Sequence, residues 1–72
     1  MLNCLSYALR YWNLYPEYRL YYNSYHVVNL PINACMGFLP IEDFGYAYFF
    51  NWYNRGLINE DDLVLLNRYF NR

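Results

Sequence analysis

The stretch PEYRLYYNSYHVVNL, residues 16–30, decides whether this chain is all helical or contains a sheet. At helical spacing its tyrosines form one stripe, whereas a strand would scatter them over two faces. Pro16 followed by an acidic residue is a favourable first turn. We therefore expect a short helix from Pro16 to about Ser24. The stripe consists of Tyr18, Tyr21, Tyr22 and Tyr25.

The segment that follows, residues 27–39, differs in composition. Val27 and Val28 are β-branched, and Pro31 holds Leu30 in an extended conformation. We expect an irregular or briefly extended segment here. If it paired with another strand, the fold would be α+β.

Residues 2–14, upstream of this stretch, predict a helix. Large apolar residues recur there at steps of three and four, so they share one helical face. Pro16 pushes Tyr15 out of the helical region, which predicts a break at that residue. The apolar residues are Leu2, Leu5, Leu9 and Trp12.

The carboxyl-terminal half predicts two helices joined by a tight turn, an αα-hairpin from Pro40 to Tyr69. Pro40 suits the first turn of one helix, and Gly56 suits the residue just beyond its end. Asn59 is a good cap for the next helix, with Asp62 three residues later. In the first helix we expect an inward face formed by Ile41, Phe44, Tyr48 and Trp52.

These elements predict a mainly α fold, a bundle of about four short helices that ends in the hairpin. Seventy-two residues are enough for one domain, 1–72, and for one core. A chain of this length has a radius of gyration of roughly 11 Å and a deep interior of only about twenty residues.

The chain contains more hydrophobic residues than that interior can hold. Hydrophobic residues make up 58% of the chain, including 11 tyrosines, 5 phenylalanines and 2 tryptophans. Part of this surplus is ordinary surface, but large rings in excess predict a contact patch. A small globule covered in tyrosine with no partner is the alternative, because the tyrosine hydroxyl tolerates water.

We expect the contact residues to be aromatic side chains left over once the core is filled. Trp12 and Trp52 are expected in the core. Trp, Tyr and Arg are the residue types that dominate binding energy in protein interfaces. The candidates are Tyr46, Phe49, Phe50 and Tyr53 on the third expected helix, and Tyr18, Tyr22 and Tyr25 on the stripe.

The sequence contains few side chains suited to catalysis or to metal binding. We therefore expect no enzyme and no catalytic, cofactor-binding or metal site. His26 is the only histidine, and a pair with Cys35 lacks a third orienting group. The carboxylates of residues 60–62 point in successive directions around a helix start. Whether Cys4 and Cys35 form a disulfide stays open.

The charge of the chain does not favour binding to nucleic acid. The net charge is -1, with no lysine, so few cations could gather against phosphate. Stacking of single-stranded bases beside Arg10 and Arg19 is the weaker alternative. No apolar run approaches the roughly twenty residues of a membrane span. The amino terminus does not resemble a secretion signal, which favours the cytoplasm.

The predicted function is therefore non-catalytic binding to a larger protein through an aromatic surface. Size and composition suggest an inhibitor or adaptor from a phage or mobile element, acting in the cytoplasm of the host cell. A self-assembling structural subunit and a single-strand nucleic-acid binder are the alternatives.

Overall fold

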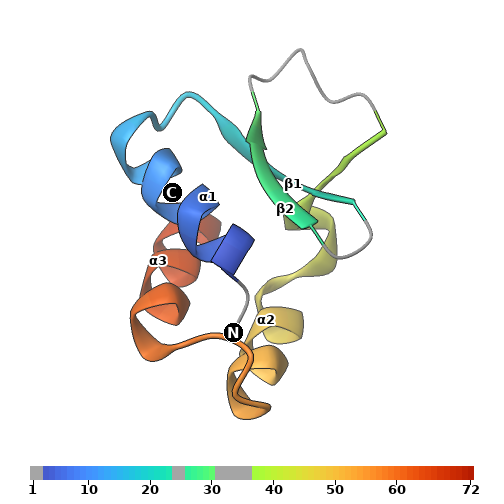
Figure 1. Cartoon of the computed structure of the whole chain (residues 1–72), viewed down its shortest axis with the longest axis vertical. Helices are drawn as coiled ribbons and strands as arrows, with labels where there is room; N and C mark the ends of the chain where they lie inside the picture. Colours follow the sequence, from blue (N-terminus) through green and yellow to red (C-terminus); the bar gives the residue numbers. More distant parts are fainter. Residues whose placement is uncertain (1–2, 24–25, 31–36) are drawn as a thin grey trace.

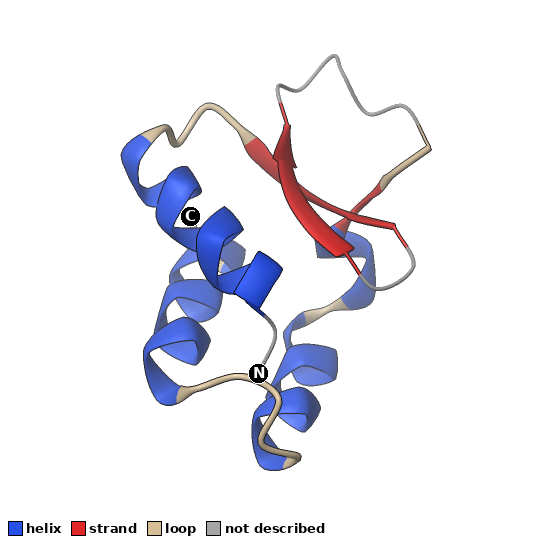
Figure 2. Ribbon diagram, in the orientation of Figure 1, coloured by secondary structure: helices blue, strands red, loops and turns tan. Residues whose placement is uncertain are grey.

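A computed structural model describes residues 3–23, 26–30 and 37–72. Within these ranges three α-helices and one short 3-10 helix pack around a three-stranded antiparallel sheet (Figures 1 and 2). The elements are α1 (Asn3–Leu14), β1 (Arg19–Asn23), β2 (His26–Leu30), β3 (Leu39–Pro40), η1 (Ile41–Phe44), α2 (Tyr46–Asn54) and α3 (Glu60–Phe70).

The fold is thus α+β, and the predicted four-helix bundle is wrong. The expected helix from Pro16 to Ser24 is instead the strand β1, which pairs with β2 over its whole length, from Arg19 opposite Leu30 to Asn23 opposite His26. The sheet has the order β2-β1-β3. Within the predicted extended segment, β2 and the start of β3 are strands, while residues 31–36 lie outside the described ranges.

The burial of β1 explains why strand wins over helix there. Leu20 and Tyr21 are adjacent and both almost completely buried. Successive strand residues point to opposite faces, so this pair requires cover on both sides of the sheet. The central strand β1 places the two side chains on opposite covered faces of the sheet.

Local signals placed the first and last helices correctly. α1 ends at Leu14, before Pro16, as predicted. The Oδ1 atom of Asn59 accepts a hydrogen bond from the backbone N–H of Asp62 at 2.8 Å, which confirms the predicted cap of α3. Gly56 has a φ of 75°, in agreement with a left-handed residue after α2.

The predicted third helix is divided in two. Gly45 adopts φ 77° and ψ 153°, a conformation open to glycine alone, and separates η1 from α2. The interruption rotates the helix that follows. Phe49 is therefore completely buried, whereas Tyr48, which we expected to face inward, is 43% exposed.

The core lies between α1, α3 and one face of the sheet. Trp12 is buried, as predicted, and its ring meets that of Tyr69 edge to face at 5.0 Å. The Cα radius of gyration is 11.2 Å, close to the expected value. No helix in the described ranges has the length and apolar character required to cross a membrane. The other buried apolar side chains of this core are Leu5, Ala8, Leu9, Leu20, Val27, Ile41, Phe49, Ile58 and Leu66.

Candidate contact surface

The outer face of α1 carries a line of tyrosines that the core leaves uncovered. Tyr7, Tyr11 and Tyr15 are 77%, 41% and 46% exposed. With the half-buried Tyr18 they form what we call the tyrosine row. The row is tightly packed at one end, since the ring of Tyr11 lies 4.8 Å from that of Tyr15 and 5.4 Å from that of Tyr18.

Helical geometry explains why these residues are outside. Leu5, Leu9 and Trp12 of α1 are buried in the core, and residues at the spacing of Tyr7 and Tyr11 fall on another side of the same helix. Leu14, at the end of α1, is 73% exposed. α1 therefore differs from an ordinary amphipathic helix, because aromatic residues occupy positions on its solvent-exposed side.

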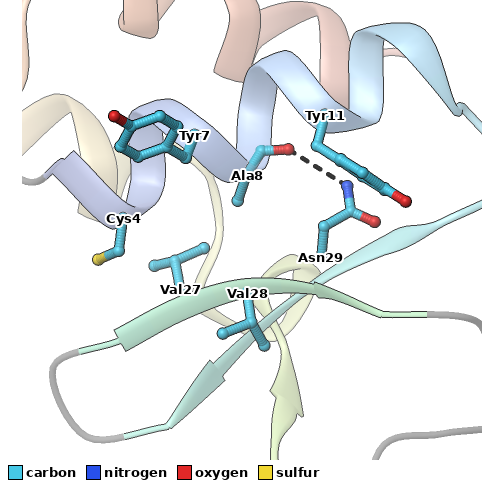
Figure 3. A pocket seen from close by; sticks show the side chains of 7 residues that line it. All are labelled: Cys4, Tyr7, Ala8, Tyr11, Val27, Val28 and Asn29. Atoms are coloured by element: carbon cyan, nitrogen blue, oxygen red, sulfur yellow. Dashed lines mark hydrogen bonds between the residues drawn. The ribbon is translucent and has the colours of Figure 1, made fainter.

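A groove of about 450 Å³ runs between α1 and β2, beside this row (Figure 3). The residues that line it are Cys4, Tyr7, Ala8 and Tyr11 of the helix and Val27, Val28 and Asn29 of the strand. None of them is an Asp, Glu, Lys, Arg or His residue. The groove is a mainly apolar site with a few polar atoms.

Asn29 fixes the distance between the two walls of the groove. Its Nδ2 donates a hydrogen bond to the backbone oxygen of Ala8 at 3.2 Å (Figure 3). Its Oδ1 is buried and accepts no hydrogen bond from a described residue. Val27 and Asn29 extend from β2 toward α1, whereas Val28 extends to the other side of the strand (Figure 3).

Tyr7 separates this groove from a second hollow on the other flank of α1. The second hollow, of about 400 Å³, is lined by Asn3, Ser6, Tyr7 and Arg10. Because Tyr7 borders both depressions, it projects as a ridge between them. A large exposed ring between two hollows is well placed to be enclosed by a partner.

Partial burial raises the pKa of Tyr11, and the neighbouring Tyr18 raises it further through electrostatic repulsion and a side-chain hydrogen bond. Tyr11 therefore keeps its proton across the physiological range. Its hydroxyl remains a neutral group that can both donate and accept a hydrogen bond.

Arg10 and Arg19, the residues considered for nucleic acid, belong to two separate ion pairs. Arg10 Nη1 lies 2.7 Å from Oδ1 of Asp62, a completely buried carboxylate that also accepts a hydrogen bond from Ser6. Arg19 lies 3.6 Å from Glu42, whose carboxylate raises the pKa of the guanidinium. Arg10 therefore pairs with Asp62, whereas Arg19 shares the carboxylate of Glu42 with Arg72.

A second polar cluster joins the carboxyl terminus to the sheet. The hydroxyl of Tyr69 accepts a hydrogen bond from the backbone N–H of Leu20 at 3.0 Å and donates one to Glu42 at 2.8 Å. Arg72 binds the same carboxylate at 3.1 Å, and its guanidinium lies 4.0 Å from the centre of the Tyr69 ring. These contacts join α3 and the carboxyl-terminal Arg72 to β1 and η1.

The candidate contact residues from the sequence are not gathered into one surface. Phe49 is completely buried and Phe50, its neighbour, is 44% exposed. Tyr46 and Tyr53 are half-buried and pack against the core. Trp52, expected in the core, is likewise half-buried against it.

On the predicted stripe, Tyr18 and Tyr22 are half-buried. Tyr22 meets Phe44 edge to face at 4.7 Å, whereas Tyr18 belongs to the tyrosine row. Tyr25 lies outside the described residues, as does Cys35. The possible disulfide from Cys4 therefore stays untested.

Sequence reasoning missed Tyr7, Tyr11, Leu14 and Tyr15. The signal was present, because tyrosines at 7, 11, 15 and 18 recur at steps of four and three, on a different side from the leucines. The sequence prediction relied instead on the stripe within residues 18–25, of which residues 19–23 form the strand β1 rather than a helix.

Over the described ranges, no three His, Cys, Asp or Glu side chains converge in a way that could hold a metal ion. Comparison of the chain with protein-family models, with curated proteins and with solved structures finds no match.

Proposed function

We propose that this protein is a non-catalytic binding module that recognises another protein through the tyrosine row of α1 and the adjoining groove. The observation that carries the proposal is the outward aromatic side of α1, where Tyr7 and Tyr11 are exposed beside Leu14 and beside Tyr15, the residue that follows the helix. Such a contiguous aromatic patch on a small protein is typical of an interaction site.

The packing within the row favours binding. The rings of Tyr11, Tyr15 and Tyr18 already touch one another, so their side chains are partly ordered before a partner arrives. A preordered tyrosine has little conformational entropy left to lose and can bury a large area. Its hydroxyl can still reach water at the rim of the interface.

The exposed aromatic residues of α2 form a weaker candidate. Tyr48 and Phe50 are two positions apart in a helix, so their side chains diverge by roughly 200°. They therefore cannot belong to one continuous contact face. This difference makes α2 a useful internal control.

The test compares two pairs of substitutions in a tagged protein expressed in its source cell. Tyr7→Ser with Tyr15→Ser removes two rings from the tyrosine row, and Tyr48→Ser with Phe50→Ser removes two rings from α2 that are 43% and 44% exposed. Proteins that co-purify are quantified by mass spectrometry, after circular dichroism has verified that both variants fold.

We expect a partner that is lost from the α1 variant and retained by the α2 variant. Loss from the α2 variant alone would assign binding to the surface around Phe50 instead. Equal retention by both variants would contradict the proposal. That the partner is a larger host protein, and that the chain comes from a phage or mobile element, remain predictions from size and composition.

A further inference from the structure

β2 is an edge strand, and its outward backbone groups can be assigned from the register. The sheet order β2-β1-β3 leaves one side of β2 without a strand among the described residues. The N–H of Leu20 donates to Tyr69 and so points away from β2. Leu20 lies opposite Asn29, which makes this a pair without mutual hydrogen bonds.

Bonded and non-bonded pairs alternate along an antiparallel ladder. The pair of Tyr21 and Val28 is therefore the hydrogen-bonded kind, and the pair of Tyr22 and Val27 is not. It follows that the N–H and C=O groups of Val27 and Asn29 point to the free edge. No described residue donates or accepts a backbone hydrogen bond there.

This edge lacks the features by which proteins usually prevent strand addition. Lysine, proline, bulges and short length are the common protections. The sequence HVVNL of β2 contains no proline and no charged residue apart from the titratable His26, and it pairs without a bulge. An unprotected five-residue edge beside an apolar groove is suited to accept another strand.

We propose that this strand is β2 of a second copy, added antiparallel across a twofold axis through Val28 to give a continuous sheet. In this register Val27 of each copy lies opposite Asn29 of the other, and the two Val28 residues face each other. The four outward-pointing residues then exchange four backbone hydrogen bonds. Moving the axis to Val27 or Asn29 would leave part of the five-residue edge unpaired.

The side chains suit this arrangement on both faces. On the face toward α1, Val27 and Asn29 of each copy keep the contacts they already make, Val27 in the core and Asn29 with the backbone oxygen of Ala8 (Figure 3). On the other face the half-buried Val28 gains an apolar cross-strand partner. A net charge of -1 per chain opposes association very little. The inference goes beyond the proposed function, since it concerns the backbone edge of β2.

A charge exchange at the axis tests the pairing. Val28→Lys places two cations on directly opposite positions, and Val28→Glu places two anions there. Sedimentation velocity of each variant alone should show self-association at least about tenfold weaker than in the unsubstituted chain, while a mixture of the two restores a dimer. Val64→Lys and Val64→Glu, at an exposed valine of α3, are matched controls that should self-associate normally.

Amide hydrogen exchange in the unsubstituted chain gives a readout that needs no substitution. Exchange at Val27 and Asn29 should slow as the concentration is raised, whereas Val28, whose N–H faces β1, should not change. A chain that stays monomeric at about 1 mM would overturn the inference, as would a dimer that persists in both Val28 variants. Because Val28 is outside the tyrosine row, failure here leaves the loss of a partner on Tyr7 and Tyr15 substitution as a separate result.

Discussion

Substitution of Tyr69 by phenylalanine tests the contact that joins α3 to the sheet. The Tyr69 ring is 1% exposed, and its hydroxyl is the acceptor for the N–H of the fully buried Leu20. Without that oxygen the N–H is left unpaired, which costs about 1–3 kcal/mol. Glu42 also loses a donor but keeps Arg72 at 3.1 Å, so its contribution is smaller. We expect a total loss of about 2–3 kcal/mol of unfolding free energy.

Urea denaturation measures this loss directly. The midpoint should fall with an unchanged slope, and the melting temperature should drop by roughly 10–20 °C for a domain of this size. Tyr7→Phe is the matched control, because that hydroxyl belongs to a side chain that is 77% exposed. It should change stability by no more than about 0.5 kcal/mol. Equal effects of the two substitutions would refute the assigned hydrogen bond.

The same hydroxyl predicts a dependence on alkaline pH. Burial raises the pKa of Tyr69 to about 12, with a contribution from Glu42, while the hydrogen bond from Leu20 opposes part of the rise. The folded state thus retains a proton that the unfolded chain loses near pH 10. This stabilisation is complete below pH 10 and decreases by about 1.4 kcal/mol per pH unit as pH rises toward 12. The advantage of the unsubstituted chain over Tyr69→Phe should therefore shrink in this window; a constant difference would refute the assignment.

Three further substitutions, each measured by urea denaturation, test the contributions to stability of a buried ring, of backbone strain and of a helix cap. Phe49→Ala should cost about 3–5 kcal/mol because the ring is completely buried, whereas Phe50→Ala should cost less than about 1 kcal/mol; similar costs would contradict the rotation of α2. Gly45→Ala should cost about 1–3 kcal/mol through backbone strain alone, since an added Cβ would meet nothing within 4 Å, and a neutral result would contradict the positive φ. Asn59→Ala should cost about 1 kcal/mol by removing the cap on Asp62, and Asn59→Asp, which keeps the acceptor, should cost less.

The parts of the fold that were predictable from sequence depend on neighbours in the chain. The cap at Asn59, the end of α1 before Pro16 and the left-handed Gly56 are decided by local dihedrals and local hydrogen bonds. Such signals operate within a few residues. Their effect therefore does not depend on the tertiary contacts of the rest of the chain.

The parts that were not predictable depend on distant partners. The tyrosines of β1 fit a helical stripe as well as they fit a strand, and only pairing with β2 and burial of both Leu20 and Tyr21 select the strand. In α2 the helical period was right and its phase was wrong. Gly45 interrupts the helix, so counting onward from Ile41 assigned the inward position to Tyr48 rather than to Phe49.

The exposed aromatic residues could not be chosen from the sequence for the same reason, because they are the ones that the core does not cover. The surplus of rings was visible in the composition, yet which rings remain outside depends on where β2 and α3 pack against α1. Those contacts cover Leu5, Leu9 and Trp12 and leave Tyr7, Tyr11 and Tyr15 exposed. No property of the tyrosines themselves distinguishes them from Tyr21 or Tyr69, which are buried.

The two uncovered features of this small domain lie along the same groove, and together they restrict the kind of molecule that could fill it. The tyrosine row could accept any apolar surface, but the outward N–H and C=O groups of Val27 and Asn29 match the spacing of donors and acceptors in an extended backbone. A lipid tail or a stacked base offers no such spacing. A polypeptide strand offers it at every second residue and can present side chains to Tyr7 and Tyr11 at the same time, which is why both proposals name protein as the partner.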